Sequence, residues 1–316
     1  MHQTGQIYRP PSEASVQRLE VTIGCSHNKC SFCTMYRKTP FRVAPLEDVE
    51  MDLKELHDRG EKITRIYLTN GDPFVLGTDR LVKIAELVHQ YLPEVEVLTC
   101  YASIQNLKAK SLEDLKLLKS VGYDELYVGL ETAYAPAVKL INKGFTVEEA
   151  YENIGKLKEA GMKYSALLML GIGGKGHSKE SVEATAALLN KYPPYRVSPL
   201  STAVLRGSEL EELCDKGEYV QLTERELIEE EKMLLRALKI NDCIFFGSHP
   251  YNLITISGVL PQDREEIIKH LDSEMAAWDR DQPGFLDTVW KRTDMWKKYT
   301  MQSDTGCFVY ENINCR

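Results

Sequence analysis

The sequence predicts an α/β protein built on a partial (βα)6 TIM-like barrel with a C-terminal extension. Strand-like segments rich in β-branched and aromatic residues alternate with amphipathic helix-like segments. The strand-then-helix unit recurs six times, at intervals of roughly 30 residues, which predicts a parallel sheet with right-handed crossovers. Six units are too few to close an eight-stranded barrel. An open doubly wound sheet is the alternative fold.

The expected elements follow one another in a regular order. The six strands are predicted over residues 18–24, 63–69, 95–101, 125–130, 164–170 and 196–204. Helix-start capping boxes occur at Ser111, Thr146 and Thr223, and amphipathic runs begin at Thr78 and Ser178. The helix that opens at Thr223 ends the sixth unit near residue 237. A further helix-like run covers residues 261–277.

No low-complexity linker divides the chain, so the predicted domain boundaries are gradual. We expect an N-terminal segment over residues 1–17 and the barrel over residues 18–237. Residues 238–316 are expected to form a C-terminal segment that covers the substrate. This segment carries the polar sequence Gly247-Ser-His-Pro-Tyr-Asn252.

Composition bounds the function classes. The chain has 316 residues, 43% of them hydrophobic, and a net charge of -8. The excess of acidic residues disfavours nucleic acid, including tRNA, as a partner. No apolar run is long enough to span a membrane, and the N-terminus lacks the apolar core of a signal peptide. A cytoplasmic protein with free thiols is therefore expected.

The most informative motif is the loop that contains Cys25, Cys30 and Cys33, directly after the first predicted strand. Three thiolates on one loop can bind three irons of a [4Fe-4S] cluster, which leaves the fourth iron for a small molecule. A structural zinc site, with His27 or a distant cysteine as fourth ligand, is the alternative. A disulfide framework is disfavoured because a chain of this length builds its own core.

This loop resembles that of the radical S-adenosylmethionine (radical SAM) superfamily, in which an aromatic residue, here Phe32, precedes the last cysteine. The loop departs from the usual pattern in one respect. It has four residues between the first two cysteines, where the superfamily usually has three. The resemblance covers roughly residues 18–237.

The resemblance implies residues that bind S-adenosylmethionine. The turn Asn70-Gly71-Asp72 stands where the superfamily binds the cofactor's amino group, although Asn70 replaces a glycine. The fourth strand ends at Glu131, at the position of an acid that meets the ribose hydroxyls. Lys143 matches a basic residue that pairs with the cofactor's carboxylate. Taken alone, these residues are ordinary turn or surface residues.

The fifth strand leads into Gly171-Ile-Gly173-Gly174-Lys-Gly176, which has the spacing G-x-G-x-x-G. A dinucleotide site is disfavoured because no acidic residue ends the next strand, and a phosphate loop is disfavoured because His177 follows Gly176. In the superfamily, a glycine-rich turn here packs against adenine. The resemblance thus implies adenine contacts at Gly171 and Gly173, with Phe32 and Leu200 as further candidates.

The function implied is that of an oxygen-sensitive radical SAM enzyme with a [4Fe-4S] cluster and S-adenosylmethionine as cofactors. Reductive cleavage of S-adenosylmethionine would give a 5'-deoxyadenosyl radical, which abstracts hydrogen from a small-molecule or peptide substrate. An electron donor such as flavodoxin or ferredoxin is implied. A non-catalytic iron–sulfur or zinc protein, serving as a scaffold or electron carrier, is the alternative. No catalytic residue is assigned.

Several side chains at the expected barrel mouth are candidates for facing a substrate, each with a structural role as the alternative. They are Tyr101, Tyr164, Arg206, His249 and Tyr251. The remaining cysteines are dispersed along the chain. Of these, Cys307 and Cys315 raise the hypothesis of a second cluster near the C-terminus.

Overall fold

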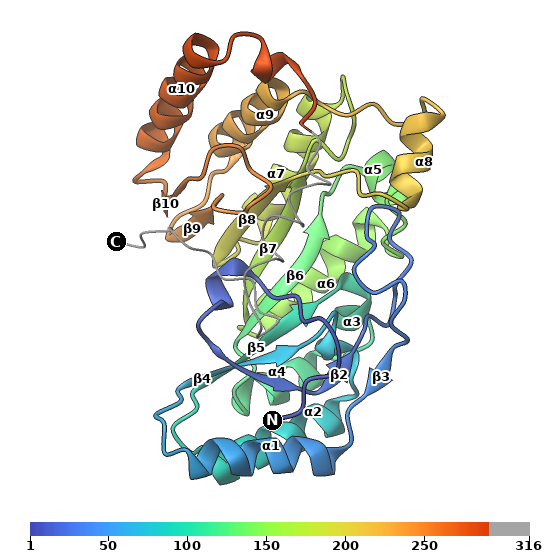
Figure 1. The fold of residues 1–316 in the computed structure, drawn as a ribbon. Helices are drawn as coiled ribbons and strands as arrows, with labels where there is room; N and C mark the ends of the chain where they lie inside the picture. The colour runs from blue at the N-terminus through green and yellow to red at the C-terminus, as the bar shows by residue number, and fades with distance from the viewer. Residues whose placement is uncertain (291–316) are drawn as a thin grey trace.

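The computed structural model describes residues 1–290 and centres on one eight-stranded sheet (Figure 1). The strand order is β1-β4-β5-β6-β7-β8-β9-β10, so neighbouring strands follow one another along the chain. All pairs from β1 to β9 are parallel, and β9 and β10 are antiparallel. A doubly wound sheet reverses its strand order at its centre. The uninterrupted order therefore excludes that alternative and matches a partial TIM-like barrel.

The six predicted strands are all present. The first is shorter than predicted, because residues 22–23 belong to a separate strand, β2 (Thr22–Ile23), and the others differ only at their ends. They are β1 (Gln17–Glu20), β4 (Arg65–Thr69), β5 (Val97–Ala102), β6 (Glu125–Glu131), β7 (Lys163–Leu170) and β8 (Arg196–Ser201). The central strands β4, β6 and β7 are buried over most of their length, as expected for a parallel sheet. The β-branched and aromatic composition thus located the sheet correctly.

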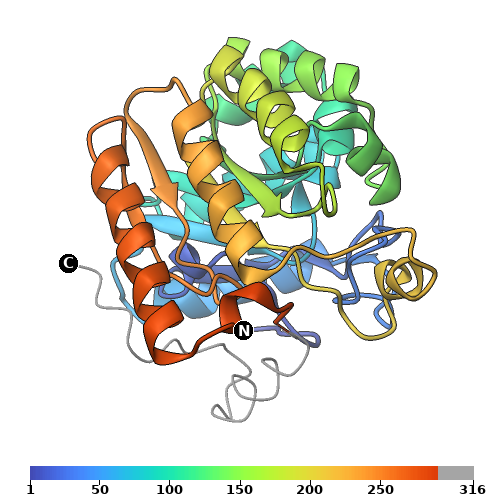
Figure 2. The same cartoon turned by 90° about the horizontal axis from the view of Figure 1, so that it is seen from above.

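Helices connect the parallel strands and pack against their neighbours along the sheet. The main ones are α1 (Leu46–Asp58), α2 (Thr78–Tyr91), α4 (Leu112–Ser120), α6 (Val147–Glu159), α7 (Ser178–Lys191) and α9 (Glu224–Ala237). Contacts join α1 to α2, α2 to α4, α4 to α6 and α7 to α9. Viewed from above, these helices surround the sheet on its outer side (Figure 2). Ser111, Thr146 and Thr223 form the predicted capping boxes.

The segment after residue 237 extends the same sheet. Strand β9 (Cys243–Phe246) pairs with β8, β10 (Ser257–Leu260) pairs with β9, and α10 (Arg264–Asp281) packs on α9. The loop between β9 and β10 holds Gly247–Asn252 at the edge of the barrel mouth. The N-terminal segment crosses in front of the sheet, on the face opposite the helices (Figure 1).

Short elements that the sequence did not predict lie in the connections between the main strands and helices and after α10. They are the hairpin of β2 (Thr22–Ile23) and β3 (Arg42–Val43), the helices α3 (Ile104–Lys108), α5 (Ala135–Leu140) and α8 (Glu209–Asp215), and 3-10 turns at Pro11–Glu13, Pro73–Val75 and Phe285–Asp287. Within the described residues, no helix combines the length and the apolar character needed to cross a bilayer.

Candidate functional site

A cavity of about 310 Å³ opens at the carboxyl ends of the parallel strands. Its wall includes Tyr101 from β5, Glu131 from β6, Met169 from β7 and Leu200 from β8. The cysteine loop closes one side of it. Ligands in parallel α/β proteins bind at this end of the sheet. The cavity therefore lies where the fold predicts a functional site.

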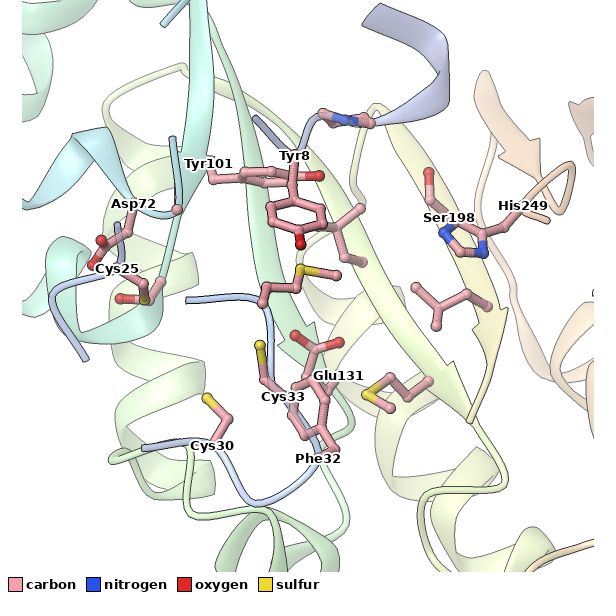
Figure 3. A pocket seen from close by; sticks show the side chains of 18 of the residues that line it. Tyr8, Cys25, Cys30, Phe32, Cys33, Asp72, Tyr101, Glu131, Ser198 and His249 are labelled. Atoms are coloured by element: carbon pink, nitrogen blue, oxygen red, sulfur yellow. The ribbon is translucent and has the colours of Figure 1, made fainter. Parts of the chain in front are cut away.

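Cys25, Cys30 and Cys33 all line this cavity (Figure 3). Backbone contacts to distant segments hold their loop in place. The Ser31 N–H donates to Ile141 O at 3.0 Å, and the Leu210 N–H donates to Ser31 O at 2.9 Å. The His27 ring bonds Asn142 O at 2.7 Å. The loop that carries the thiols is thus fastened to the end of α5 and the start of α8.

Burial dominates the electrostatics of the three thiols. It raises the pKa of Cys25 to about 12 and that of Cys30 to about 11, and it also raises the pKa of Cys33. Thiolates in such a place need a positive partner, because burying an uncompensated charge is costly. Iron supplies that charge, so thiols in this setting fit a metal-bound group.

The donor set fits a cluster better than a zinc ion. A structural zinc site closes with four protein ligands. A cubic cluster takes one thiolate per iron, so the three thiols of the loop leave its fourth iron open. The other described cysteines, Cys100, Cys214 and Cys243, do not line the cavity, and His27 bonds Asn142. Cys307 and Cys315 lie outside the described residues.

Asp72 and Gly71 connect the second parallel strand to the cysteine loop. The Asp72 carboxylate accepts hydrogen bonds from the Ser26 N–H, at 2.9 Å, and from the Ser26 hydroxyl. Gly71 approaches so closely that an added Cβ would lie 2.7 Å from the Cβ of Cys25. Burial raises the pKa of Asp72, against the opposing effect of the Ser26 hydrogen bonds. Both residues line the cavity.

Glu131 and Lys143 form an ion pair beside the cysteines. Lys143 Nζ lies 2.8 Å from Glu131 Oε1, and both side chains are almost buried. Glu131 has a left-handed backbone (φ 62°) at an irregularity in the β6–β7 pairing, which turns its side chain toward the cavity. Burial lowers the pKa of Lys143, but Glu131 and Cys30 raise it, and the net shift is upward. The ammonium therefore stays charged.

The predicted adenine contacts divide into two groups. Phe32 and Leu200 line the cavity, with Lys143 Nζ 5.9 Å from the Phe32 ring centroid. Gly171 and Gly173 do not line it: Gly171 bonds Glu230 and Tyr219, and an added Cβ would meet Leu227 at 2.7 Å. The glycine-rich turn thus packs beneath the cavity against the segment that leads into α9.

Asn70 also lies outside the cavity wall. Its side-chain amide donates to Thr22 O at 3.1 Å, and its N–H donates to the Thr22 hydroxyl at 3.2 Å. These bonds tie the end of β4 to β2. Asn70 thereby supports the turn that presents Gly71 and Asp72 from behind.

Three of the five substrate-facing candidates line the cavity, namely Tyr101, His249 and Tyr251. The other two do not line it, and Tyr164 takes the structural role given as its alternative. Tyr164 is fully buried in β7, where its hydroxyl donates to Tyr192 O. Arg206 is exposed in the loop after β8 and does not line the cavity. Successive side chains of a strand point to opposite faces of the sheet. Tyr164 points to the face that the helices cover, and so it lies in the core and not in the cavity.

Sequence reasoning missed one part of the wall. Tyr8 and Tyr36 line the cavity and contact each other edge to face, with ring centroids 5.3 Å apart. Ser198 on β8 and Phe246 on β9 complete the wall on the side of the cavity away from the cysteine loop. Tyr8 lies in a segment without a motif, so only its aromatic character beside Pro10-Pro11 could have drawn attention to it.

Comparison with known proteins adds family information to this geometry. The family model described as the radical SAM superfamily matches residues 19–189. An uncharacterized protein of Methanocaldococcus jannaschii, MJ0486, is 26% identical over 220 residues, which cover 66% of this chain and 67% of that protein. A tRNA uridine(34) acetyltransferase of the same organism is 27% identical over 118 residues, 37% of this chain and 22% of its own length.

Among solved structures, methylornithine synthase (PylB) superposes with a TM-score of 0.51 at 15% sequence identity. The match covers 82% of this chain and 81% of that one. At this identity the likeness concerns the fold, and it agrees with the partial barrel described above. This chain therefore matches 67% of the length of MJ0486, 22% of the length of the acetyltransferase and 81% of the length of PylB.

Proposed function

The chain belongs to the radical SAM superfamily, and we propose that it reductively cleaves S-adenosylmethionine at a [4Fe-4S] cluster held by Cys25, Cys30 and Cys33. A [4Fe-4S] cluster and S-adenosylmethionine are the cofactors of this superfamily. One observation carries the proposal for these residues. The three thiols share one cavity with a carboxylate turn and a buried ion pair.

Different residues of the cavity bind different chemical groups of S-adenosylmethionine. Gly71 and Asp72 offer a backbone and a carboxylate to the amino group, and Lys143 offers a positive charge to the carboxylate. Glu131 accepts hydrogen bonds from the ribose hydroxyls. Phe32 and Leu200 give apolar contact to adenine. Asn70, Gly171 and Gly173 support this wall from outside the cavity.

When bound, the cofactors supply a 5'-deoxyadenosyl radical that abstracts a hydrogen atom from the substrate. The protein must orient the substrate and keep water away. Leu167, Met169 and Leu205 make the wall between the strands apolar, which serves both tasks. The substrate is a small molecule or a peptide segment that fits this wall.

An electron donor such as flavodoxin or ferredoxin fits the surface of the cysteine loop. Between residues 25 and 45 the sequence contains no acidic residue, although the chain as a whole is acidic. The exposed side chains of Lys29, Arg37, Lys38 and Arg42 lie in this segment, and within the described residues none of them forms a salt bridge. An acidic electron carrier is attracted to such a surface.

Anaerobic reconstitution with iron and sulfide, followed by reduction with dithionite, tests the proposal. We expect the wild-type protein to convert S-adenosylmethionine to 5'-deoxyadenosine and methionine. Cys30→Ala should lose the cluster absorbance and this activity while it keeps its far-UV circular dichroism, because the loop lies outside the core. Cys214→Ala, a half-exposed cysteine outside the cavity, is the matched control.

The alternative is a non-catalytic iron–sulfur or zinc protein, which the family match does not favour. A colourless protein that holds one zinc ion, or a brown protein that forms no 5'-deoxyadenosine, would establish it. Unfolding of Cys30→Ala would indicate that the metal serves the structure.

A further inference from the structure

The wall of the cavity that faces away from the cysteine loop is mainly apolar, and Ser198 and His249 are among its polar side chains. Ser198 and His249 lie side by side there, on the side away from Cys30 and Cys33 (Figure 3). Apolar residues of β8, β9 and their loops surround them, namely Pro199, Leu200, Ala203, Leu205 and Phe246. Any substrate that lies against this wall meets these two polar groups.

The hydrogen bonds of His249 fix its tautomer. The Tyr251 N–H donates to His249 Nδ1 at 3.1 Å, so Nδ1 must carry a lone pair. A neutral ring with an accepting Nδ1 holds its proton on Nε2. Burial also lowers the pKa of His249 to about 4, so the ring is neutral at physiological pH. Among the described residues, Nε2 has no hydrogen-bond partner.

The loop that carries His249 is held rigidly. Asn252 accepts hydrogen bonds from the Ser201 N–H, at 2.7 Å, and from the Ser201 hydroxyl. Its amide donates to Pro199 O at 3.0 Å and to Gly247 O at 2.7 Å. The Tyr251 ring packs edge to face on His249, with centroids 5.0 Å apart. The donor on His249 is therefore positioned before any substrate arrives.

We propose that His249 Nε2–H, with the Ser198 hydroxyl beside it, binds a neutral carbonyl-type oxygen of a substrate whose body is apolar or aromatic. The inference rests on the proposed function, since it assigns the substrate side of the same cavity. It names a substrate class and a positioning residue for it.

The His249 ring itself favours this class over two others. A protonated amine needs an acceptor, and the one lone pair of the ring is occupied by the Tyr251 N–H. A carboxylate needs a positive charge to offset its loss of water, and a neutral imidazole has none. A neutral oxygen acceptor requires only the one donor that the ring presents.

The first test measures the tautomer itself. Long-range ¹H–¹⁵N spectra of the holoprotein with an oxidised cluster and labelled histidine give the protonation of each ring nitrogen. The signals of His249 are identified by their loss in His249→Gln. We expect Nε2 protonated and Nδ1 unprotonated throughout the physiological pH range. A proton on Nδ1, or a doubly protonated ring at neutral pH, would overturn the proposal.

The second test compares probes of the same shape in the presence of S-adenosylmethionine and without reductant. Acetophenone has the neutral oxygen, ethylbenzene lacks it, and benzoate is charged. We expect acetophenone to bind about tenfold or more tightly than the other two, which is the effect of one good hydrogen bond. Its binding should also shift the Nε2–H resonance of His249.

Variants assign this preference to one side chain. His249→Phe should bind acetophenone and ethylbenzene about equally, because it keeps an aromatic ring and loses the donor. His249→Gln keeps a donor and should retain part of the preference. His270→Phe, at an exposed position of α10, should behave as the wild type. Equal binding of the probes to the wild type, or a full preference in His249→Phe, would refute the assignment.

These outcomes are separate from the proposed function. Formation of 5'-deoxyadenosine by the wild type tests the proposed cleavage of S-adenosylmethionine and uses no probe. The tautomer and the probe preference test the proposed role of His249 and need no turnover. If His249→Phe fails to fold, the spectrum of the wild type still decides the question.

Discussion

At the scale of single residues, Gly71 shows how closely the turn after β4 approaches the cysteine loop. An added Cβ would lie 2.7 Å from Cys25 Cβ and 2.8 Å from Gly24 O. Neither neighbour is the flexible end of a side chain, so the loop itself must shift. The site of Cys25 thus depends on a residue that has no side chain.

Gly71→Ala is therefore expected to displace Cys25 and to lower the iron content of the reconstituted protein several-fold. The strain should also lower the free energy of unfolding by about 1–3 kcal/mol. Iron analysis and chemical denaturation measure the two effects. Gly77→Ala is the control, since nothing lies within 4 Å of its added Cβ. Full cluster loading in Gly71→Ala would show that the loop adapts to the larger side chain.

Glu231 on α9 is a second informative residue, because it is buried and Oε1 has no hydrogen-bond partner among the described residues. Burial raises its pKa to about 8. The folded state therefore keeps a proton that the unfolded chain releases at lower pH. The contribution of this carboxyl to stability therefore falls as the pH rises from the ordinary glutamate value to about 8.

Glu231→Gln removes this titration. Its stability relative to wild type should increase steadily as the pH rises from about 5 to about 8. Urea denaturation at several pH values measures the difference. Glu265→Gln, at an exposed position of α10, should show no such trend. A constant difference between Glu231→Gln and wild type would mean that Glu231 is ionised in the folded protein.

The sequence identified the polar part of the site better than the apolar part. Cys25, Cys30, Cys33, Asp72, Glu131 and Lys143 all line one cavity. The spacing of the cysteines made them visible as a motif, whereas the other three were identified through the resemblance to the superfamily. Tyr8 and Ser198 reach the cavity only through the path of the chain, which no local pattern encodes. Gly171 and Gly173 matched a motif letter for letter, yet they pack against α9 and Tyr219.

At the scale of elements, local signals placed the helices because their first turns carry their own hydrogen-bond partners. The Thr223 side chain accepts from the Glu226 N–H, and Glu226 bonds the Thr223 N–H in return. The short strands β9 and β10 lacked such signals, since their pairing depends on β8 and on each other. Long-range pairing explains why the sequence did not show that the C-terminal segment extends the sheet.

The loop between β9 and β10 is held by Asn252, whose side chain makes four hydrogen bonds to Ser201, Pro199 and Gly247. Asn252→Ala leaves the backbone groups among these partners unsatisfied in a buried place. We expect a loss of stability of about 1–3 kcal/mol and faster amide exchange over residues 247–252. Denaturation and hydrogen exchange by mass spectrometry measure both. Asn241→Ala, at an exposed position, is the control. Unchanged exchange in Asn252→Ala would show that the loop is held by other contacts.

At the scale of the whole molecule, the charge is unevenly distributed. The net charge is -8, but the surface of the cysteine loop is basic through Lys29, Arg37, Lys38 and Arg42. Opposite charges accelerate association, and salt weakens the effect. The uneven distribution favours an acidic electron carrier that approaches at the cluster side.

Reversal of the four charges to glutamate should slow reduction by flavodoxin hydroquinone by about tenfold or more at low salt. The difference should shrink as salt is added. Stopped-flow absorbance of the cluster measures the rate. Dithionite and the methyl viologen radical carry opposite charges and need no docking surface. Their rates show whether the four substitutions change the electrostatic potential around the cluster in general. A variant with Lys54, Lys83, Lys116 and Lys158 reversed, exposed on four helices, is the control. Equal losses in both variants would argue against a docking surface.

The order of the strands has a consequence for synthesis. Each strand from β4 to β10 joins the edge that the preceding strand of the sheet has just formed. A chain emerging from the ribosome can therefore build the sheet one edge at a time, without waiting for a distant partner. The thiols and the carboxylate turn come first, and the side that presents His249 is the last part of the chamber to be completed.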